Sequence, residues 1–450
     1  MTAPTTPSTS QAPTWSNWAG QQHCTPSVLA RPYSERELTE VIARAGDAGH
    51  TVRPVGSGHS FTDTCVTDGV QVDLRHLAQL IDADPSSGLV RVQAGMPLHR
   101  LCDALHEHGL ALENQGDIDR QTIAGALATG THGTGARFRN LSAGVVGCRI
   151  ALADGTVREL TADSGLSGEL LRAARVSLGA LGVITELTLQ TVPAFRLRKV
   201  EEPRPLDDLI DGFHELAAAH DHYEFYAFPY AKTALSFASD RTDDPPAPLP
   251  RWRKWVVDDL IANRGLAAFS QAGRVAPRRA PQISRAMTRL LSRDVRTDHS
   301  HRVFASERRV RFTEMEYAIP RAQVGAALRE VLALIEDQRI GVTFPIEVRA
   351  TAADDAPLST ASGRDTAYIA VHQFVPMPYE AYFRAVEAIM DRHDGRPHWG
   401  KRHFQTAATL APRYPEWDAF QAARRELDPH GLFTNDYVRR VLGPPPAERA

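Results

Sequence analysis

The stretch that decides the fold is "VRPVGSGHSFTDT", residues 52–64. A β-branched run predicts a strand that ends in a loop, where Gly56 and Gly58 allow backbone conformations with positive φ. In such a loop, backbone N–H groups converge on an anion and the neighbouring serines add hydroxyl donors. We therefore expect a phosphate-bearing ligand here, beside the imidazole of His59. The alternative is a glycine-rich surface turn with an incidental histidine.

Three familiar loop motifs do not fit this stretch. Residues 58–62 lack the last glycine of the G-x-S-x-G turn that presents a serine nucleophile in hydrolases. The loop also matches neither the P-loop G-x-x-x-x-G-K-[ST] nor the dinucleotide motif G-x-G-x-x-G. A ligand at this loop must therefore be held in another way.

Composition narrows the class of protein. The 450 residues suffice for two or three domains, and 51 basic against 54 acidic residues do not favour a nucleic-acid-binding protein. The four scattered cysteines lack C-x-x-C spacing, so we expect a reducing compartment. Residues 1–13 predict a disordered tail rather than a signal peptide. Because no apolar run approaches about 18 residues, we expect a cytoplasmic protein without a membrane span, with peripheral membrane association left open.

The first part of the chain alternates between helix and strand patterns. Residues 33–48 predict an amphipathic helix with Ser34 and Glu37 as a capping box. Asp154-Gly155 predicts a hairpin with a type I′ turn within residues 145–160. The remaining expected elements are strands at 51–55, 69–74, 89–94 and 182–193 and a helix at 96–109. Together these patterns predict one α+β domain.

The character of the chain changes after Pro193. Residues 242–252 predict a proline-rich connection or an exposed loop. Residues 251–302 hold twelve Arg or Lys against four Asp, which indicates either a solvated helical face or a contact for an anionic membrane or an acidic protein partner. Strand patterns at 343–350 and 368–374 and a helix pattern at 382–393 then indicate a second α+β domain.

Two further glycine-rich loops resemble the first. Residues 116–136 contain five glycines, four threonines and a second loop histidine, and residues 177–185 run straight into a strand. One such loop is weak evidence. Three of them in the same domain indicate one long ligand, such as a dinucleotide, lying against exposed backbone.

At this point the motifs, taken in order, resemble a known family. "RPVGSGHSFTDT", "ATGTHGTG", "SLGALGVIT", "FPIEVR" and "PHWGK" are similar to motifs of the vanillyl-alcohol-oxidase-type flavoproteins, and more narrowly to the aldonolactone oxidoreductases. The similarity extends from residue 15 to residue 443. It implies an α+β fold with a two-subdomain, PCMH-type FAD-binding domain at residues 14–195. A substrate (cap) domain at 196–450 follows, with its C-terminal segment returning to the flavin.

The resemblance also implies which residues bind FAD. A histidine at the position of His59 is often bonded covalently to the flavin in this family, and covalent attachment varies among relatives. Residues of the loops match the family's flavin contacts: Gly56, Ser57, Gly58, His59, Ser60, Phe61, Gly116, Asp117, Thr122, Gly125, Thr129, Thr131, His132, Gly133, Gly182, Val183 and Ile184.

Candidate catalytic residues lie in the second domain. In the strand "FPIEVRA", Glu347 and Arg349 project to the same face, where they can grip a polyol or a lactone, although a surface salt bridge gives the same pattern. "GRPHWGK" satisfies G-x-x-x-x-G-K, but Arg402 follows instead of Ser or Thr, so we reject a P-loop. The resemblance implies instead that Lys401 approaches the flavin and that His372 assists deprotonation of the substrate hydroxyl. A hydrogen-bonded core histidine is the alternative for His372.

The resulting hypothesis is an FAD-dependent oxidation of an aldono-1,4-lactone at its C2 hydroxyl, which gives ascorbate or an analogue. An alditol oxidase and a non-catalytic flavin-binding protein are the alternatives. The electron acceptor, oxygen or a cytochrome-like carrier, is left open. A metal site at His214, His220 and His222 or at His299 and His301 is less favoured, because the spacing does not match that of a zinc-binding helix. We expect no metal.

Overall fold

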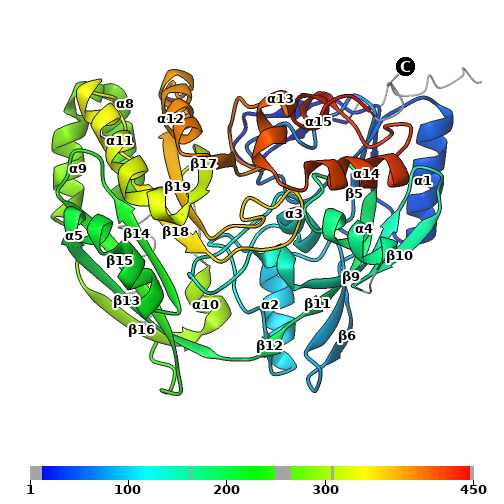
Figure 1. Cartoon of the computed structure of the whole chain (residues 1–450), viewed down its shortest axis with the longest axis horizontal. Coiled ribbons are helices and arrows are strands. Elements are labelled where there is room, and N and C mark those ends of the chain that lie inside the picture. Colours follow the sequence, from blue (N-terminus) through cyan, green and yellow to red (C-terminus); the bar gives the residue numbers. More distant parts are fainter. Residues whose placement is uncertain (1–12, 163–164, 249–264, 306–308, 446–450) are drawn as a thin grey trace, which may run out of the picture.

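The computed structural model describes residues 13–162, 165–248, 265–305 and 309–445. Figure 1 shows a large antiparallel sheet on one side and two smaller sheets on the other. Two short pairs complete the strands: β1 (Trp15–Ser16) with β2 (His23–Cys24), and β8 (Leu110–Ala111) with β12 (Val192–Pro193). The expected α+β class is therefore observed.

A three-stranded parallel sheet carries the opening loop. Its strand order is β3 (Val28–Ala30), β5 (Val70–Asp73) and β4 (Val52–Val55). Strand β4 is buried and ends at Val55, so the chain enters the loop at Gly56. Gly58 has φ of +70°, as the loop chemistry predicts, whereas Gly56 does not have positive φ.

A five-stranded antiparallel sheet follows. Its order is β10 (Val157–Thr161), β9 (Val145–Ala151), β11 (Val183–Gln190), β7 (Leu89–Gln93) and β6 (Leu80–Asp84). The hairpin of β9 and β10 is confirmed, but the type I′ turn is wrong. The backbone N–H of Leu152 bonds Thr156, and of the loop residues only Gly155 has positive φ, +78°. A type I′ turn needs two such residues, so the sequence instead forms a three-residue loop that ends in a left-handed glycine.

The eight-stranded antiparallel sheet makes up most of the second half. In spatial order it contains β16 (Asp294–His299), β13 (Arg196–Pro205), β15 (Thr233–Thr242), β14 (His222–Ala227), β18 (Ile346–Thr351), β19 (Thr366–Phe374), β17 (Phe312–Pro320) and β20 (Arg396–Pro397). In β17, β18 and β19, nearly every residue is buried on both faces. Polar side chains in these central strands therefore face other parts of the protein.

The helices cover these sheets. In α1 (Glu35–Asp47), the Ser34 hydroxyl accepts the Glu37 N–H, while the Glu37 carboxylate accepts the N–H of Tyr33, so the predicted capping box is only half formed. The other helices are α2 (Leu98–Glu107), α3 (Ile123–Ala128), α4 (Leu166–Arg175), α5 (Leu206–Asp211), α6 (Phe213–Ala219), α8 (Leu266–Val275), α9 (Ala280–Thr288), α10 (Ser300–Phe304), α11 (Val324–Asp337), α12 (Glu380–Arg392), α13 (Ala407–Leu410), α14 (Trp417–Leu427) and α15 (Asp436–Leu442).

Two hydrophobic cores hold the sheets and helices together. The first joins the two smaller sheets to side chains of α13, α14 and α15, so the C-terminal helices pack on the N-terminal half of the chain (Figure 1). The second lies between the large sheet and helices α5, α6, α11 and α12. The domain boundary after residue 195 stays a prediction.

The remaining expectations concern the surface. Residues 243–248 form an exposed loop, whereas residues 1–12 and 249–264 lie outside the described residues. All four cysteines are free. None of the described helices is long and apolar enough to cross a lipid bilayer.

Candidate active site

A groove between the two smaller sheets contains the predicted FAD loops. Its empty volume, including space open to solvent, is about 930 Å³. Its walls come from the loop after β4, from α3 and from the segment that enters β11. The predicted cofactor residues on these walls are Gly56, Ser57, Gly58, His59, Ser60, Thr122, Gly125, Thr129, Gly182, Val183 and Ile184.

At two glycines of this groove, a side chain would clash with neighbouring atoms. A Cβ atom at Gly56 would lie 2.4 Å from Oγ1 of Thr122, whose hydroxyl accepts the Gly125 N–H and caps α3. Gly182 has φ of +147°, and its Cβ would lie 2.7 Å from the Ala151 carbonyl oxygen. A long groove with bare backbone on several sides fits a dinucleotide such as FAD.

A second cavity opens beside the groove. Its empty volume, including space open to solvent, is about 690 Å³, and it shares His59, Ser60, Gln121 and Thr129 with the groove. His59 therefore stands at the junction of the two spaces, with its ring 5.8 Å from that of Trp18. Burial lowers the pKa of His59, which favours the neutral, nucleophilic imidazole.

All four predicted catalytic residues line the second cavity. They are Glu347, Arg349, His372 and Lys401. Predicted cofactor residues Phe61, Gly116, Asp117, Thr131 and His132 line it too, so sequence and geometry converge on one site. Gly133 alone lies elsewhere, on a third cavity that adjoins the second.

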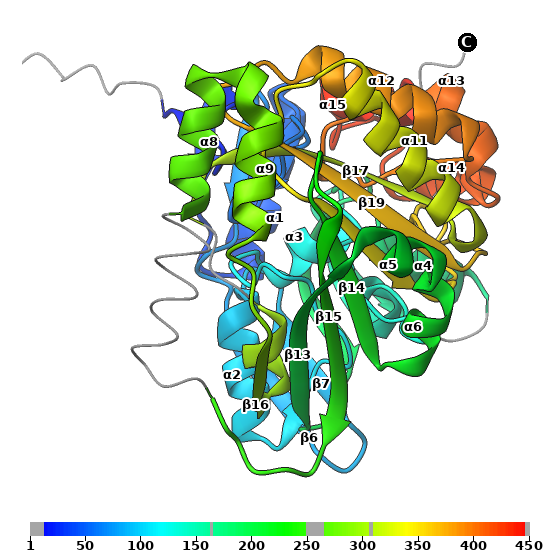
Figure 2. The same ribbon diagram turned by 90° about the vertical axis from the view of Figure 1, so that its left-hand side faces the viewer.

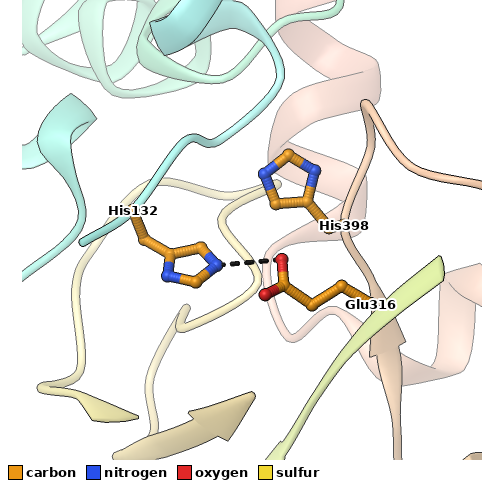
Figure 3. Close-up of side chains that lie close together, drawn as sticks. All are labelled: His132, Glu316 and His398. Carbon is orange, nitrogen blue, oxygen red and sulfur yellow. Dashed lines mark hydrogen bonds and ion pairs between the residues drawn. The ribbon is translucent and has the colours of Figure 1, made fainter. Parts of the chain in front are cut away.

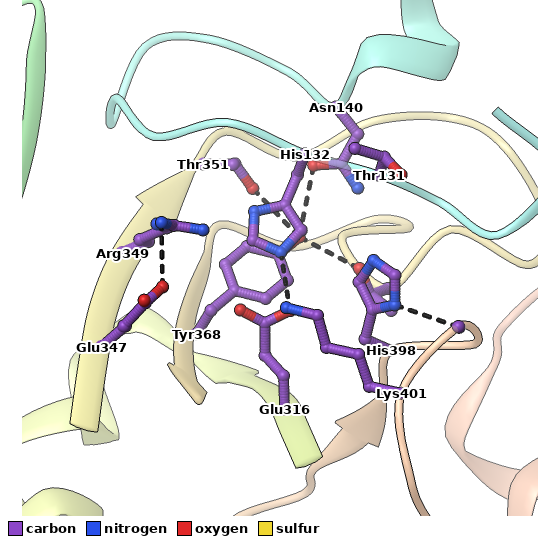
Figure 4. Close-up of polar contacts among 12 residues, drawn as sticks. Thr131, His132, Asn140, Glu316, Glu347, Arg349, Thr351, Tyr368, His398 and Lys401 are labelled. Carbon is purple, nitrogen blue, oxygen red and sulfur yellow. Dashed lines mark hydrogen bonds and ion pairs between the residues drawn. The ribbon is translucent and has the colours of Figure 1, made fainter. Parts of the chain in front are cut away.

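Arg349 is held between two carboxylates. Its Nη2 lies 2.9 Å from Glu347, as expected for neighbours on one strand face (Figure 4). Its Nε lies 2.5 Å from Glu224 of β14. Burial alone would lower the pKa of Arg349, but the two carboxylates outweigh burial and raise it well above its usual value. The guanidinium is therefore a fixed cation at the cavity wall.

Lys401 is likewise paired twice. Its ammonium lies 2.6 Å from Glu314 and 2.8 Å from Glu316, two carboxylates on one face of β17. Both glutamates are almost fully buried. Burial alone would raise the pKa of Glu314, but the nearby positive charges, of which Lys401 contributes most, outweigh burial and lower this pKa to about 2. Sequence reasoning missed both glutamates.

His372 faces carboxylates on one side and a carbonyl on the other. Its Nδ1 lies 3.1 Å from the Pro345 oxygen and therefore carries a proton, which leaves Nε2 to accept one. Nε2 lies 3.4 Å from Glu314 and 3.9 Å from Glu347. Burial alone would lower the pKa of His372, but these carboxylates outweigh it and raise the pKa above its ordinary value.

A histidine pair completes the wall near Lys401. His132, Glu316 and His398 offer ligand atoms within 4.8 Å of one another, close enough to hold a metal ion (Figure 3). However, the Lys401 ammonium already neutralises Glu316. Nδ1 of His398 accepts the Gly400 N–H, so its Nε2 carries the proton and is not a lone-pair donor. The group is better described as a hydrogen-bonded network, in which Tyr368 stacks on His132 at 3.5 Å (Figure 4).

The other histidines considered as metal ligands do not converge on one such group within the described residues. His220 bonds Asp240 at 2.8 Å, His222 bonds the Thr134 carbonyl at 2.8 Å, and His214 is exposed. His299 and His301 lie beside His106 of α2, with ring centroids 4.1 and 5.3 Å from it.

Comparisons with known proteins identify the family of the chain. Residues 187–441 match the family described as D-arabinono-1,4-lactone oxidase, and residues 26–161 match the FAD binding domain. The FAD prediction is thereby confirmed. The chain is 52% identical to an L-gulono-1,4-lactone dehydrogenase of Mycobacterium tuberculosis over 96% of this chain and all of the relative. It is 32% identical to an alditol oxidase of a Streptomyces species over 95% of this chain and 98% of the relative.

Solved structures confirm the fold. The cholesterol oxidase of B. sterolicum superposes with a TM-score of 0.82 over 99% of this chain and all of that chain, at 18% identity. The two-subdomain FAD-binding architecture predicted from the sequence is therefore confirmed. The family match and the relatives confirm the oxidoreductase class.

Proposed function

The chain belongs to the family of FAD-dependent aldonolactone oxidoreductases, and from this premise we propose that it oxidises L-gulono-1,4-lactone or a closely similar aldono-1,4-lactone at the C2 hydroxyl. One observation carries the proposal. The cavity that holds Glu347, Arg349, His372 and Lys401 opens directly onto the FAD groove at His59. A sugar in this cavity therefore lies next to the cofactor.

The charge and position of each cavity residue indicate its role in the reaction. When bound, FAD supplies the acceptor for a hydride, at its N5, from the carbon that carries the 2-hydroxyl. Nε2 of His372 takes the hydroxyl proton, and the carboxylates of Glu314 and Glu347 stabilise the imidazolium that results. Glu347 and Arg349 orient the lactone by hydrogen bonds. The C2 ketone formed from L-gulono-1,4-lactone tautomerises to ascorbate.

Lys401 stabilises the site through its position. Its charge is already matched by Glu314 and Glu316, so it holds these carboxylates in place and presents its remaining hydrogen-bonding capacity to the cavity. We expect it to contact the FAD edge, where negative charge develops on reduction.

The test is a visible absorption spectrum followed by turnover. Purified protein should show a flavin spectrum that bleaches under anaerobic conditions when L-gulono-1,4-lactone is added, and ascorbate should appear with an artificial acceptor. A flavin-loaded protein that no aldonolactone reduces would overturn the proposal. Alditols serve as the second candidate substrates, because one relative is named an alditol oxidase. A higher kcat/KM for an alditol would favour that alternative.

The electron acceptor forms part of the same proposal. Because the relative at 52% identity is named a dehydrogenase, we propose that a carrier other than oxygen reoxidises the enzyme. Helices α8 and α9 stand side by side at one end of the molecule (Figure 2). Residues 265–293 contain no acidic residue, and six arginines there are exposed: Arg274, Arg278, Arg279, Arg285, Arg289 and Arg293. This basic surface suits an acidic carrier or an anionic membrane.

Oxygen consumption and salt dependence test this part. Hydrogen peroxide formed at the full turnover rate would exclude a dedicated carrier. If an acidic carrier docks on α8 and α9, reduction of that carrier should slow as salt rises, whereas reduction of a small neutral dye should not. Equal salt dependence with both acceptors would exclude the docking surface.

A further inference from the structure

A third cavity lies behind Arg349. Its empty volume, including space open to solvent, is about 410 Å³. It shares Asp117 and Arg349 with the second cavity, so the two spaces adjoin at these side chains. Its other walls include Gln115, His222 and Ser239. None of the proposed chemical steps uses this cavity.

Two buried polar groups on its walls lack hydrogen-bond partners among the described residues. One is Nε2 of His222 and the other is Nε2 of Gln115. Both side chains are at most 4% exposed. An unsatisfied buried polar atom is costly and rare, so two of them around one cavity indicate a bound group that satisfies both.

The hydrogen bonds of these side chains define what that group must offer. Nδ1 of His222 faces the Thr134 carbonyl at 2.8 Å and must donate, so Nε2 is left as an acceptor. Burial lowers the pKa of His222 to about 4, which keeps the ring neutral at pH 7. The Gln115 amide oxygen accepts from Cys102, and its NH₂ group remains as a donor. One wall therefore accepts a hydrogen bond and another donates one.

The position of His222 is fixed by aromatic packing. Its ring stacks on Phe138 with centroids 4.6 Å apart and meets the ring of Phe304 edge-on at 4.8 Å. Gly133 of the same cavity wall packs tightly on the neighbouring chain, because a Cβ atom there would lie 2.2 Å from Oδ1 of Asn114. The arrangement is thus a rigid polar recess next to the reaction site.

We propose that the cavity bounded by Gln115, Gly133, His222 and Ser239 is a subsite for the hydroxylated exocyclic arm of the sugar substrate. A hydroxyl group both donates and accepts, which matches His222 and Gln115 together. The lactone ring occupies the cavity of Glu347 and His372, and the arm passes Arg349 into the recess. This subsite rests on the proposed function and adds a determinant of chain length to it.

The test compares two lactones. L-Gulono-1,4-lactone has two hydroxyls on its arm, whereas D-arabinono-1,4-lactone has one. In flavin-loaded His222→Phe, kcat/KM for the longer lactone should fall by about three- to tenfold relative to the shorter one, since one neutral hydrogen bond is lost. His222→Gln, whose amide reaches the place of Nε2, should restore part of the ratio. His214→Phe, at an exposed position on α6, is the matched control.

Other outcomes decide the proposal as well. An unchanged ratio in His222→Phe would mean that the cavity holds only water, and would overturn the subsite. If that variant does not fold, Gln115→Met is judged on the same ratio. If the wild type oxidises neither lactone, the proposed function fails on its own. The subsite is then judged by titrating the flavin absorbance of wild type and His222→Phe with a pentitol and a hexitol, where an unchanged affinity ratio would exclude it.

Discussion

Nε2 of His372 lies 3.4 Å from Oε1 of Glu314, and both residues are at most 5% exposed. At this depth the carboxylate acts on the imidazole with little screening by water. The base proposed for the reaction is therefore tuned by a residue of a neighbouring strand, and its protonation state follows the charge of Glu314.

The first prediction concerns the pH dependence of catalysis. His372 accepts a proton only when neutral, and its pKa is raised, so kcat/KM should rise with pH through an ionisation above the ordinary histidine value. Glu314→Gln removes one cause of the raised pKa, so the acidic limb of the profile should move to lower pH. His372→Gln should lose that limb.

The control for this experiment is Glu380→Gln, which changes an exposed carboxylate of α12. Its pH profile should match that of the wild type. An acidic limb that stays in place in Glu314→Gln would show that His372 is not the group that titrates.

The second prediction concerns the stability that Lys401 provides. Lys401→Met leaves Glu314 and Glu316 without their cation in a buried site, and removal of one partner from such a site typically costs about 3–5 kcal/mol. Denaturant unfolding of the flavin-loaded protein measures the loss. The double variant Lys401→Met/Glu316→Gln should recover at least about 0.5 kcal/mol, since one of the unpaired charges is gone.

An exposed pair provides the comparison. Arg384→Met breaks the surface pair with Glu380 and should cost less than about 1 kcal/mol. A similar cost for Lys401→Met and Arg384→Met would mean that water reaches Glu316 and Glu314 in the native state.

The residues of the FAD groove could be predicted from the sequence because the motifs that mark them are local. Glycines, threonines and a histidine lie close together in each loop, and the three loops keep their order along the chain. Gly56 and Gly182 are then explained by contacts that a Cβ would violate. The hairpin was likewise predicted, although its exact turn depends on the φ angles of Asp154 and Gly155, which the dipeptide alone does not determine.

The two carboxylates that pair with Lys401 could not be predicted from the sequence in the same way. In "FTEMEYAIP", Glu314 and Glu316 alternate with apolar residues, which is also the pattern of a strand with one face in water. Their burial depends on segments far away in the sequence. Lys401 and His132 lie 85 and 184 positions from Glu316. The two glutamates could have been found by searching for carboxylates to pair with Lys401, because that lysine was already a predicted site residue.

The third prediction concerns Arg53, which joins three segments around the FAD groove. Its guanidinium is 1% exposed and donates to the carbonyl oxygens of Thr64 at 2.9 Å, Leu178 at 2.6 Å and Phe433 at 2.7 Å. Arg53→Met leaves the buried oxygens of Leu178 and Phe433 without this donor, whereas the Thr64 oxygen keeps a hydrogen bond from Asn435, so the free energy of unfolding should fall by at least about 2 kcal/mol. Arg36→Met, at an exposed position on α1, should change it little.

The same variant should also lose FAD. Arg53 lines the groove, and the segments that it joins form two of the groove's walls. Because a ligand that binds only the native state stabilises it, excess FAD should raise the melting temperature of Arg53→Met in a concentration-dependent manner. Full flavin content with unchanged stability would show that the three segments hold together without Arg53.

The fourth prediction concerns a covalent bond between His59 and FAD. His59 stands where the groove meets the catalytic cavity, and burial lowers its pKa so that the ring is a neutral nucleophile at pH 7. After acid precipitation of the holoenzyme, the flavin absorbance should therefore remain in the pellet. In His59→Ala it should move to the supernatant, while FAD still binds the native protein through Gly56, Thr122 and Gly182.

The control is His50→Ala, at an exposed position outside the groove, which should keep the flavin in the pellet. Flavin released from the wild type would reduce His59 to a non-covalent contact and leave the lactone chemistry of His372 intact.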